Sequence, residues 1–178
     1  TIAVAVPVGV VAAWKAGTWI DRSVMGFSVL GFSIPVFVIA YLLIMLFSMQ
    51  LGWLPVQGYR SINEGWWPFV SHLILPSVAL GTVYMALIAR ITRATMLEVL
   101  SQDYIRTAQA KGLSSNQVLL GHALKNAAVP IVTVIGIGIA LLISGVVVTE
   151  TVFAIHGIGR LTVDAILFVK VNEWENHR

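Results

Sequence analysis

The sequence has no cysteine and little charge. The absence of cysteine among its 178 residues excludes disulfides, thiolate metal sites and a cysteine nucleophile. Only 11% of the residues are charged, whereas 58% are hydrophobic. A soluble domain of this length would need far more charge to cover its surface. The composition therefore indicates an integral membrane protein.

Signatures of several other protein classes are also missing. No phosphate-binding loop of the form GxxxxGK followed by Ser or Thr is present, so we expect the chain not to bind ATP itself. No acid–base pair or nucleophile constellation lies near an apolar run, which argues against a membrane-embedded enzyme. The four histidines, at positions 72, 122, 156 and 177, lack metal-ligand spacing, and we expect neither a metal site nor a cofactor.

Long uncharged runs predict membrane-spanning helices. A helix needs about 20 apolar residues to cross the hydrocarbon core. Residues 26–49 and 127–149 have this length, residues 73–89 form a shorter span, and residues 1–14 resemble the end of a span that begins upstream. These ranges predict an all-α fold, a polytopic transmembrane helical bundle. Because the three longer runs contain no Asp, Glu, Lys or Arg, a proton- or sodium-coupled transporter built on intramembrane carboxylates is disfavoured.

Basic residues are distributed unevenly between the connections. Residues 15–22 carry two basic residues and residues 90–126 carry five, whereas residues 50–72 and 150–164 carry one each. By the positive-inside rule, the first two segments are cytoplasmic and the last two are external. The basic residues counted here are Lys15, Arg22, Arg90, Arg93, Arg106, Lys111 and Lys125 inside, and Arg60 and Arg160 outside.

Proline and tryptophan mark positions near the ends of the predicted spans. Pro35, Pro76 and Pro130 lie in or at the edges of spans, where they are either tolerated kinks and first-turn prolines or bends in helices that line a gated pathway. The external segment 50–72 contains three tryptophans, at positions 53, 66 and 67, as expected for an interfacial aromatic belt.

The cytoplasmic segment is predicted to form a helix, a glycine turn and a second helix. Residues 95–110 contain neither glycine nor proline, and their apolar residues recur with helical period. Lys111 and Gly112 follow, a cation and then a residue free to adopt positive φ, as at a helix C-terminus. Ser114 then acts as the N-cap of a second helix that runs to Pro130, with Gln117 at the capping-box position.

Two interpretations of this segment remain open, a solvated basic loop that fixes topology and a helix offered to a soluble partner. Residues 90–126 are 37 in number, more than a simple connection between two spans needs. The apolar face of the predicted helix must also pack against another surface. The small residues Thr107, Ala108 and Ala110 allow close approach of another protein. An exposed i,i+3 pair of Asp103 with Arg106 would add only about 0.3–0.5 kcal/mol.

The segment Ala89–Gly136, "ARITRATMLEVLSQDYIRTAQAKGLSSNQVLLGHALKNAAVPIVTVIG", resembles the inner-membrane permeases of binding-protein-dependent ABC importers, in the dipeptide/oligopeptide branch. Arg106, Thr107 and Ala108 stand at the first three positions of the family's cytoplasmic loop motif, and Gly112 stands at its glycine. Arg106 replaces the acidic residue of the general motif. Flanking stretches also agree, among them "WIDRSVMGFSVLGFSIPVF", "QLGWLPVQGY" and "VVVTETVFAIHGIGRLTVDAI".

The resemblance implies one permease transmembrane domain over residues 1–178, in a multi-pass protein of a bacterial or archaeal cytoplasmic (inner) membrane. Such a permease carries peptides or related small solutes. Its partners are a second homologous permease, two cytoplasmic ATPase subunits that bind ATP, an extracytoplasmic solute-binding protein and the lipid bilayer, with no nucleic acid. The alternative function is a secondary transporter or channel subunit. The residues implied for ATPase coupling are Asp103, Tyr104, Arg106, Thr107, Ala108, Ala110, Lys111 and Gly112.

The sequence departs from the family pattern at three places. Thr1 already lies within an apolar run, so we expect the family's first span to be incomplete here. Ile155 and His156 replace an expected Trp-Pro pair. The C-terminal stretch "LFVKVNEWENHR" differs from the family's usual continuation into a final span.

Overall fold

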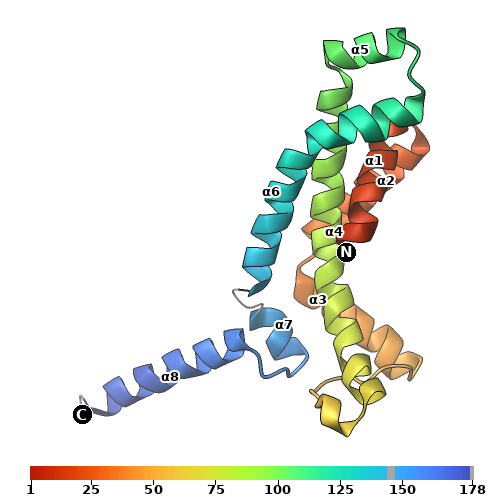
Figure 1. Ribbon diagram of the computed structural model, residues 1–178. Helices are drawn as coiled ribbons and strands as arrows, with labels where there is room; N and C mark the ends of the chain where they lie inside the picture. The colour runs from red at the N-terminus through yellow and green to blue at the C-terminus, as the bar shows by residue number, and fades with distance from the viewer. Residues whose placement is uncertain (144–146, 177–178) are drawn as a thin grey trace. The chain divides into compact units, whose positions relative to one another are not determined.

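The computed structural model describes residues 1–143 and 147–176, and within them every element of regular secondary structure is a helix (Figure 1). The predicted all-α fold is confirmed. The elements are α1 (Ile2–Trp14), α2 (Trp19–Ser33), α3 (Val36–Leu43), the π-helix η1 (Ile44–Gln50), the 3-10 helix η2 (Ile62–Glu64), α4 (Trp66–Leu100), α5 (Asp103–Ala110), the π-helix η3 (Gln117–Ala123), α6 (Leu124–Ile143), α7 (Val147–Val152) and α8 (Ile158–Asn176).

Among the described residues, two stretches of helix are long and apolar enough to cross a membrane, Trp66–Leu100 and Gln117–Leu142, the second made of η3 and nearly all of α6. The pair α2 and α3–η1 qualifies as a third if it is counted as one broken span. The chain also divides into two compact units. The first contains Thr1–Ile34 and Gly81–Gly138, and the second contains Pro35–Leu80 and the described part of Ile139–Arg178.

The helices differ from the predicted spans at their ends. The predicted span 73–89 lies inside α4, whose 35 residues begin at Trp66. Pro68 is the third residue of this helix, and the first turn tolerates proline because its N–H groups have no intrahelical partner. The seven residues 66–72 are therefore helical, although the sequence assigned them to the external segment. The predicted span 127–149 includes residues 144–146, which lie outside the described residues.

The predicted span 26–49 is divided in the structure. Helix α2 ends at Ser33, and Ile34 adopts an extended conformation with ψ of 124° before Pro35. This follows from the clash between a proline ring and an α-helical preceding residue. By contrast, Pro76 and Pro130 lie inside α4 and α6, which continue through them. The interpretation that these prolines bend helices lining a gated pathway stays a prediction.

In the first unit, α1 packs closely against the C-terminal part of α4 (Figure 1). A Cβ atom built at Gly9 would lie 2.6 Å from the Thr92 Cβ and 2.7 Å from the Ala89 carbonyl oxygen. Ala5, Ile88 and Ala89 form a buried cluster beside this contact. Small residues thus let the two helix backbones approach each other, as is common between helices in membranes.

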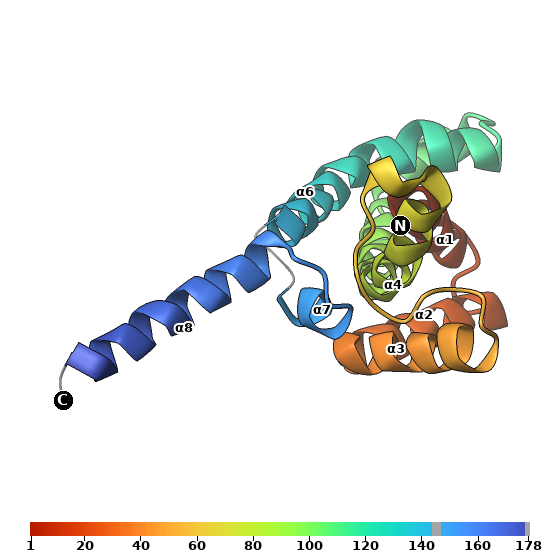
Figure 2. The same ribbon diagram turned by 90° about the horizontal axis from the view of Figure 1, so that it is seen from below.

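In the second unit, α3 and η1 pack with the N-terminal part of α4 and with α7, and Figure 2 shows α7 beside α3. Buried side chains from all four elements form one cluster, among them Ala40, Ile44, Leu75 and Val152. The connection after η1 is tied to α7 by two hydrogen bonds. Gln57 Nε2 donates to the Val152 carbonyl over 2.9 Å, and Gly58 N donates to the Phe153 carbonyl over 2.9 Å.

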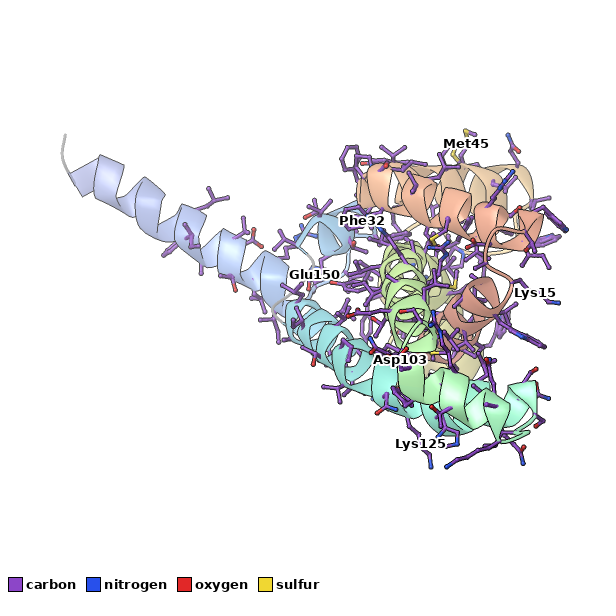
Figure 3. All side chains as sticks on the ribbon, turned by 90° about the horizontal axis from the view of Figure 1, so that it is seen from above. Lys15, Phe32, Met45, Asp103, Lys125 and Glu150 are labelled. Carbon is purple, nitrogen blue, oxygen red and sulfur yellow. The ribbon has the colours of Figure 1, made fainter. Side chains whose placement is uncertain are left out.

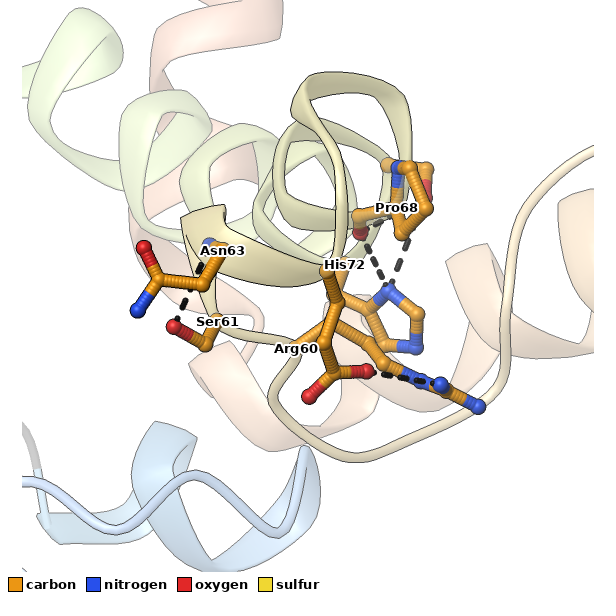
Figure 4. A network of polar contacts seen from close by, with 7 residues as sticks. Arg60, Ser61, Asn63, Pro68 and His72 are labelled. Carbon is orange, nitrogen blue, oxygen red and sulfur yellow. Dashed lines mark hydrogen bonds and ion pairs between the residues drawn. The ribbon is translucent and has the colours of Figure 1, made fainter.

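Polar contacts order the segment that leads into α4 (Figure 4). Arg60 Nη1 donates to Glu64 Oε2 over 2.8 Å, and this hydrogen bond lowers the pKa of the exposed Glu64 carboxyl. His72 Nδ1 and Ser71 Oγ both donate to the Pro68 carbonyl, over 2.6 Å and 3.0 Å. Two side chains therefore bond back to one backbone carbonyl at the start of α4.

Candidate functional site

The predicted helix over residues 95–110 is interrupted in the structure. Helix α4 ends at Leu100, and α5 begins at Asp103. Between them, Ser101 Oγ donates to the Glu98 carbonyl over 2.7 Å, and Gln102 adopts an extended conformation with φ of −72° and ψ of 149°. Serine favours helix ends because its hydroxyl competes for backbone groups. The interpretation of residues 95–110 as one helix was therefore wrong, and α5 is a separate eight-residue helix.

The glycine turn after α5 has the predicted conformation. Gly112 has φ of +81°, which L side chains rarely adopt. Its N–H donates to the Gln109 carbonyl over 2.9 Å, and the Leu113 N–H donates to the Ala108 carbonyl over 3.3 Å. These two bonds constitute a Schellman motif. A Cβ atom built at Gly112 would meet no atom within 4 Å, so the backbone conformation alone requires glycine here.

The predicted capping box that starts the next helix is also confirmed. Ser114 N donates to Gln117 Oε1 over 3.0 Å, and Gln117 N donates to Ser114 Oγ over 3.4 Å. The Ser114 hydroxyl also donates to Gln117 Oε1 over 2.9 Å. These bonds satisfy backbone donors that a helix N-terminus leaves free. Only two residues, Leu113 and Ser114, separate the Schellman glycine from this helix, so the direction of the chain is fixed on both sides of the turn.

Two side chains anchor α5 to the rest of the first unit. Ile105 is 1% exposed and Ala108 is 8% exposed. Both belong to a buried cluster that includes Met96 of α4 and Val118 of η3. The interpretation of Ala108 as part of a surface for another protein is corrected, because this residue faces the chain's own core. Ile105, which sequence reasoning left out of the site, is the principal anchor.

A hydrogen bond also joins α5 to the start of α6. Asn126 Nδ2 donates to the Tyr104 hydroxyl over 2.9 Å and to the His122 carbonyl over 2.9 Å. Tyr104 is 42% exposed, so its ring lies at the margin of the buried cluster. The two partners are 22 positions apart in the sequence, with no local signal for this bond, and Asn126 was missed for that reason. Buried contacts and this bond together attach α5 to the parts of α4 and α6 that belong to the first unit.

The remaining predicted residues form the outward face of α5 and its turn. Arg106 Nη1 lies 3.7 Å from Asp103 Oδ1, and both side chains are at least 75% exposed, so this ion pair adds little stability. Thr107 Oγ1 donates to the Asp103 carbonyl over 3.0 Å. Figure 3 shows Lys125, at the start of α6, pointing away from the helices. The exposed members of the predicted set are Asp103, Tyr104, Arg106, Thr107, Ala110, Lys111 and Gly112.

We call this outward face of α5 and Gly112 the α5 surface. It belongs to a short helix that is held to the first unit by its buried residues Ile105 and Ala108. Its exposed side chains are polar or small, and Thr107 and Ala110 leave room for another protein to come close. Its exposed residues form no acid–base pair of the kind that chemical catalysis requires.

Comparison with known proteins gives matches along nearly the whole chain. Residues 5–174 match the family described as "Binding-protein-dependent transport system inner membrane component". A probable peptide ABC transporter permease of Sinorhizobium fredii is 60% identical over 166 residues, which are 93% of this chain and 53% of that protein. The chain spans about half the length of the curated relatives it matches.

Two further relatives carry names from the same class. The di/tripeptide transport system permease of Pseudomonas aeruginosa is 44% identical over 178 residues, covering 89% of this chain and 53% of that protein. The dipeptide transport system permease of Escherichia coli K12 is 41% identical over 187 residues, covering 92% of this chain and 55% of that protein. From the matched range and these identities, the chain belongs to the family of inner-membrane components of binding-protein-dependent transport systems.

Proposed function

We propose that this chain forms part of a transmembrane permease subunit of an ATP-driven importer of peptides or related small solutes. Membership of the family of inner-membrane transport components supports this function, as do relatives that are named for peptide and dipeptide transport. The observation that carries the proposal is the anchored α5 surface, which lies in a segment predicted to be cytoplasmic. The permease itself performs no chemistry, and ATP is bound and hydrolysed by partner subunits.

In this proposal α5 is the coupling helix of the permease. Two cytoplasmic ATPase subunits close on ATP, and one of them moves the α5 surface that it holds. Because Ile105 is buried beneath α5 and Tyr104 is bonded to Asn126, the displacement carries α4 and α6 with it. A second homologous permease completes the pathway, and an extracytoplasmic binding protein delivers the solute. The assembly resides in a bacterial or archaeal inner membrane.

Reconstitution tests the proposal. The complete protein, its partner permease and the ATPase subunits are purified together and inserted into liposomes that contain ATP and an internal regenerating system on the ATPase side. Uptake of radiolabelled dipeptide, tripeptide and longer peptide is then measured with and without the binding protein. We expect uptake only when ATP and the binding protein are both present. Uptake that needs an ion gradient and ignores ATP would contradict the proposal and support a secondary transporter.

A further inference from the structure

A charged pair in the first unit joins the start of α2 to the C-terminal part of α4. Both carboxylate oxygens of Asp21 accept from Arg93: Nε donates to Oδ1, and Nη2 donates to Oδ2 over 2.7 Å. Asp21 Oδ2 also accepts from the Gly17 N–H over 2.9 Å. Asp21 is 3% exposed, and among the described residues it is the only charged residue that is buried.

The pair is positioned between the α1–α2 turn and the residues that anchor α5. Arg93 lies one helical turn before Met96, whose side chain is fully buried in the cluster that holds Ile105. Gly17, with φ of +79°, forms the turn that leads from α1 into α2. The buried cluster thus connects α5 to α4 one helical turn from Arg93, and the ion pair connects Arg93 to α2.

The start of α2 has few other attachments. Within residues 19–23 Asp21 is the only buried residue, and Trp19 is 75% exposed. A two-pronged arginine–carboxylate contact fixes orientation as well as distance, which a single apolar contact does not. A buried ion pair adds little net stability, because the cost of removing the two charges from water offsets their attraction. The fixed orientation that the pair gives to α2 relative to α4 therefore explains its presence better than a gain in stability does.

We infer that the Asp21–Arg93 pair is a clamp that passes the movement of α5 to α2, which makes Asp21 and Arg93 positioning residues for transport. This inference rests on the proposed function of α5. Without the clamp, α4 and α5 would still follow the ATPase, but α2 would lag behind them. The expected defect is therefore uncoupling, in which ATP hydrolysis continues and solute uptake falls.

The test uses the complete protein assembled with its partner permease and ATPases in liposomes. Arg93→Gln leaves the buried carboxylate of Asp21 without its partner, and Asp21→Asn leaves the partly exposed Arg93 without its partner, so either single variant can fail to assemble. The double variant Asp21→Asn/Arg93→Gln removes both charges and so restores assembly while it removes the charged clamp. Arg22→Gln is the matched control, since Arg22 is a neighbouring exposed arginine.

Two reporters separate transmission from simple support. A cysteine at Gln109 is crosslinked to the ATPase to report on α5, and an environment-sensitive fluorophore on a cysteine at Ser23 reports on α2. In the protein with an intact clamp, ATP should change both signals. In the double variant we expect the crosslink to respond as before, the fluorophore to lose its response, and solute transported per ATP to fall roughly tenfold, within the usual range of coupling between sites. The Arg22→Gln control should behave as the unmodified protein.

Several results would overturn the proposed role of the Asp21–Arg93 pair. One is a double variant that assembles and keeps both its fluorescence response and its transport per ATP. A second is a fluorescence signal that does not change with ATP in the protein with an intact clamp. A third is a double variant that fails to assemble, since the pair would then only hold the fold. Absence of any crosslink from Gln109→Cys in the unmodified background would overturn the proposed function together with the clamp.

Discussion

Replacing Gly112 by alanine isolates the backbone requirement of the turn after α5. No atom lies within 4 Å of a Cβ built at this position, so the methyl group meets no steric obstacle. The residue would nevertheless have to hold φ of +81°. The left-handed conformation costs an L-residue about 1–2 kcal/mol. A cost of this size changes the ratio of correctly to incorrectly turned segment by a factor of about 5–30.

The chain offers a matched control in Gly121. It is equally open, with nothing within 4 Å of a built Cβ, but it lies in η3 and has no positive φ. Alanine there should be neutral or stabilise the helix by about 0.5–1 kcal/mol. The two substitutions add the same methyl group, and they differ only in the backbone conformation that the residue must adopt.

The assay is ATP hydrolysis by the assembled transporter, stimulated by the solute-loaded binding protein. We expect stimulation to decrease in the order glycine, asparagine, alanine and valine at position 112, because asparagine tolerates positive φ and valine is β-branched. The Gly121→Ala variant should match the unmodified protein. Full stimulation with Gly112→Val would refute the reasoning, and so would equal damage from alanine at both positions.

Three further predictions follow from the packing and the polar contacts. Gly9→Ala places a Cβ 2.6 Å from a side-chain carbon of α4, so the overpacking should cost about 1–3 kcal/mol and lower the thermal unfolding midpoint in detergent, whereas Gly26→Ala should not; equal midpoints would contradict the close approach of α1 and α4. Tyr104→Phe removes a hydrogen bond to α6 that contributes about 0.5–1.5 kcal/mol, and amide hydrogen exchange in α5 should accelerate; unchanged exchange would show that the bond is unimportant. Because the hydrogen bond from Arg60 lowers the pKa of Glu64, their ion pair should persist above the ordinary glutamate pKa and be lost as the pH falls through the lowered value. Proteolysis of the segment before α4 should then increase in the unmodified protein but not in Glu64→Gln.

Local signals in the sequence predicted the turn of the candidate site well. The Schellman glycine at position 112 and the capping box of Ser114 and Gln117 each depend on residues within a few positions of one another. The all-α fold followed from long uncharged runs in the same way. Such features are set by backbone conformation and by burial of a whole segment, and both can be inferred without knowledge of the neighbouring helices.

Features that depend on neighbouring elements could not be predicted. Which side of α5 faces inward is decided by η3 and α4, so Ala108 was assigned to the outer surface although it is buried. Asp21 and Arg93 are 72 residues apart, and no spacing in the sequence connects them.

Crosslinking at Gln109 and Ala108 tests most directly whether an ATPase holds the α5 surface. The two residues are adjacent in the sequence, but the side chain of Gln109 is exposed to solvent. Ala108 is only 8% exposed and packs against the chain's own core. This chain contains no cysteine, so Gln109→Cys and Ala108→Cys can each be introduced singly and paired with cysteines in the ATPase groove. We predict a crosslink that changes with ATP for Gln109→Cys and none for Ala108→Cys. Equal crosslinking of both, or labelling of Gln109→Cys only from outside the cell, would contradict the proposed coupling role of α5.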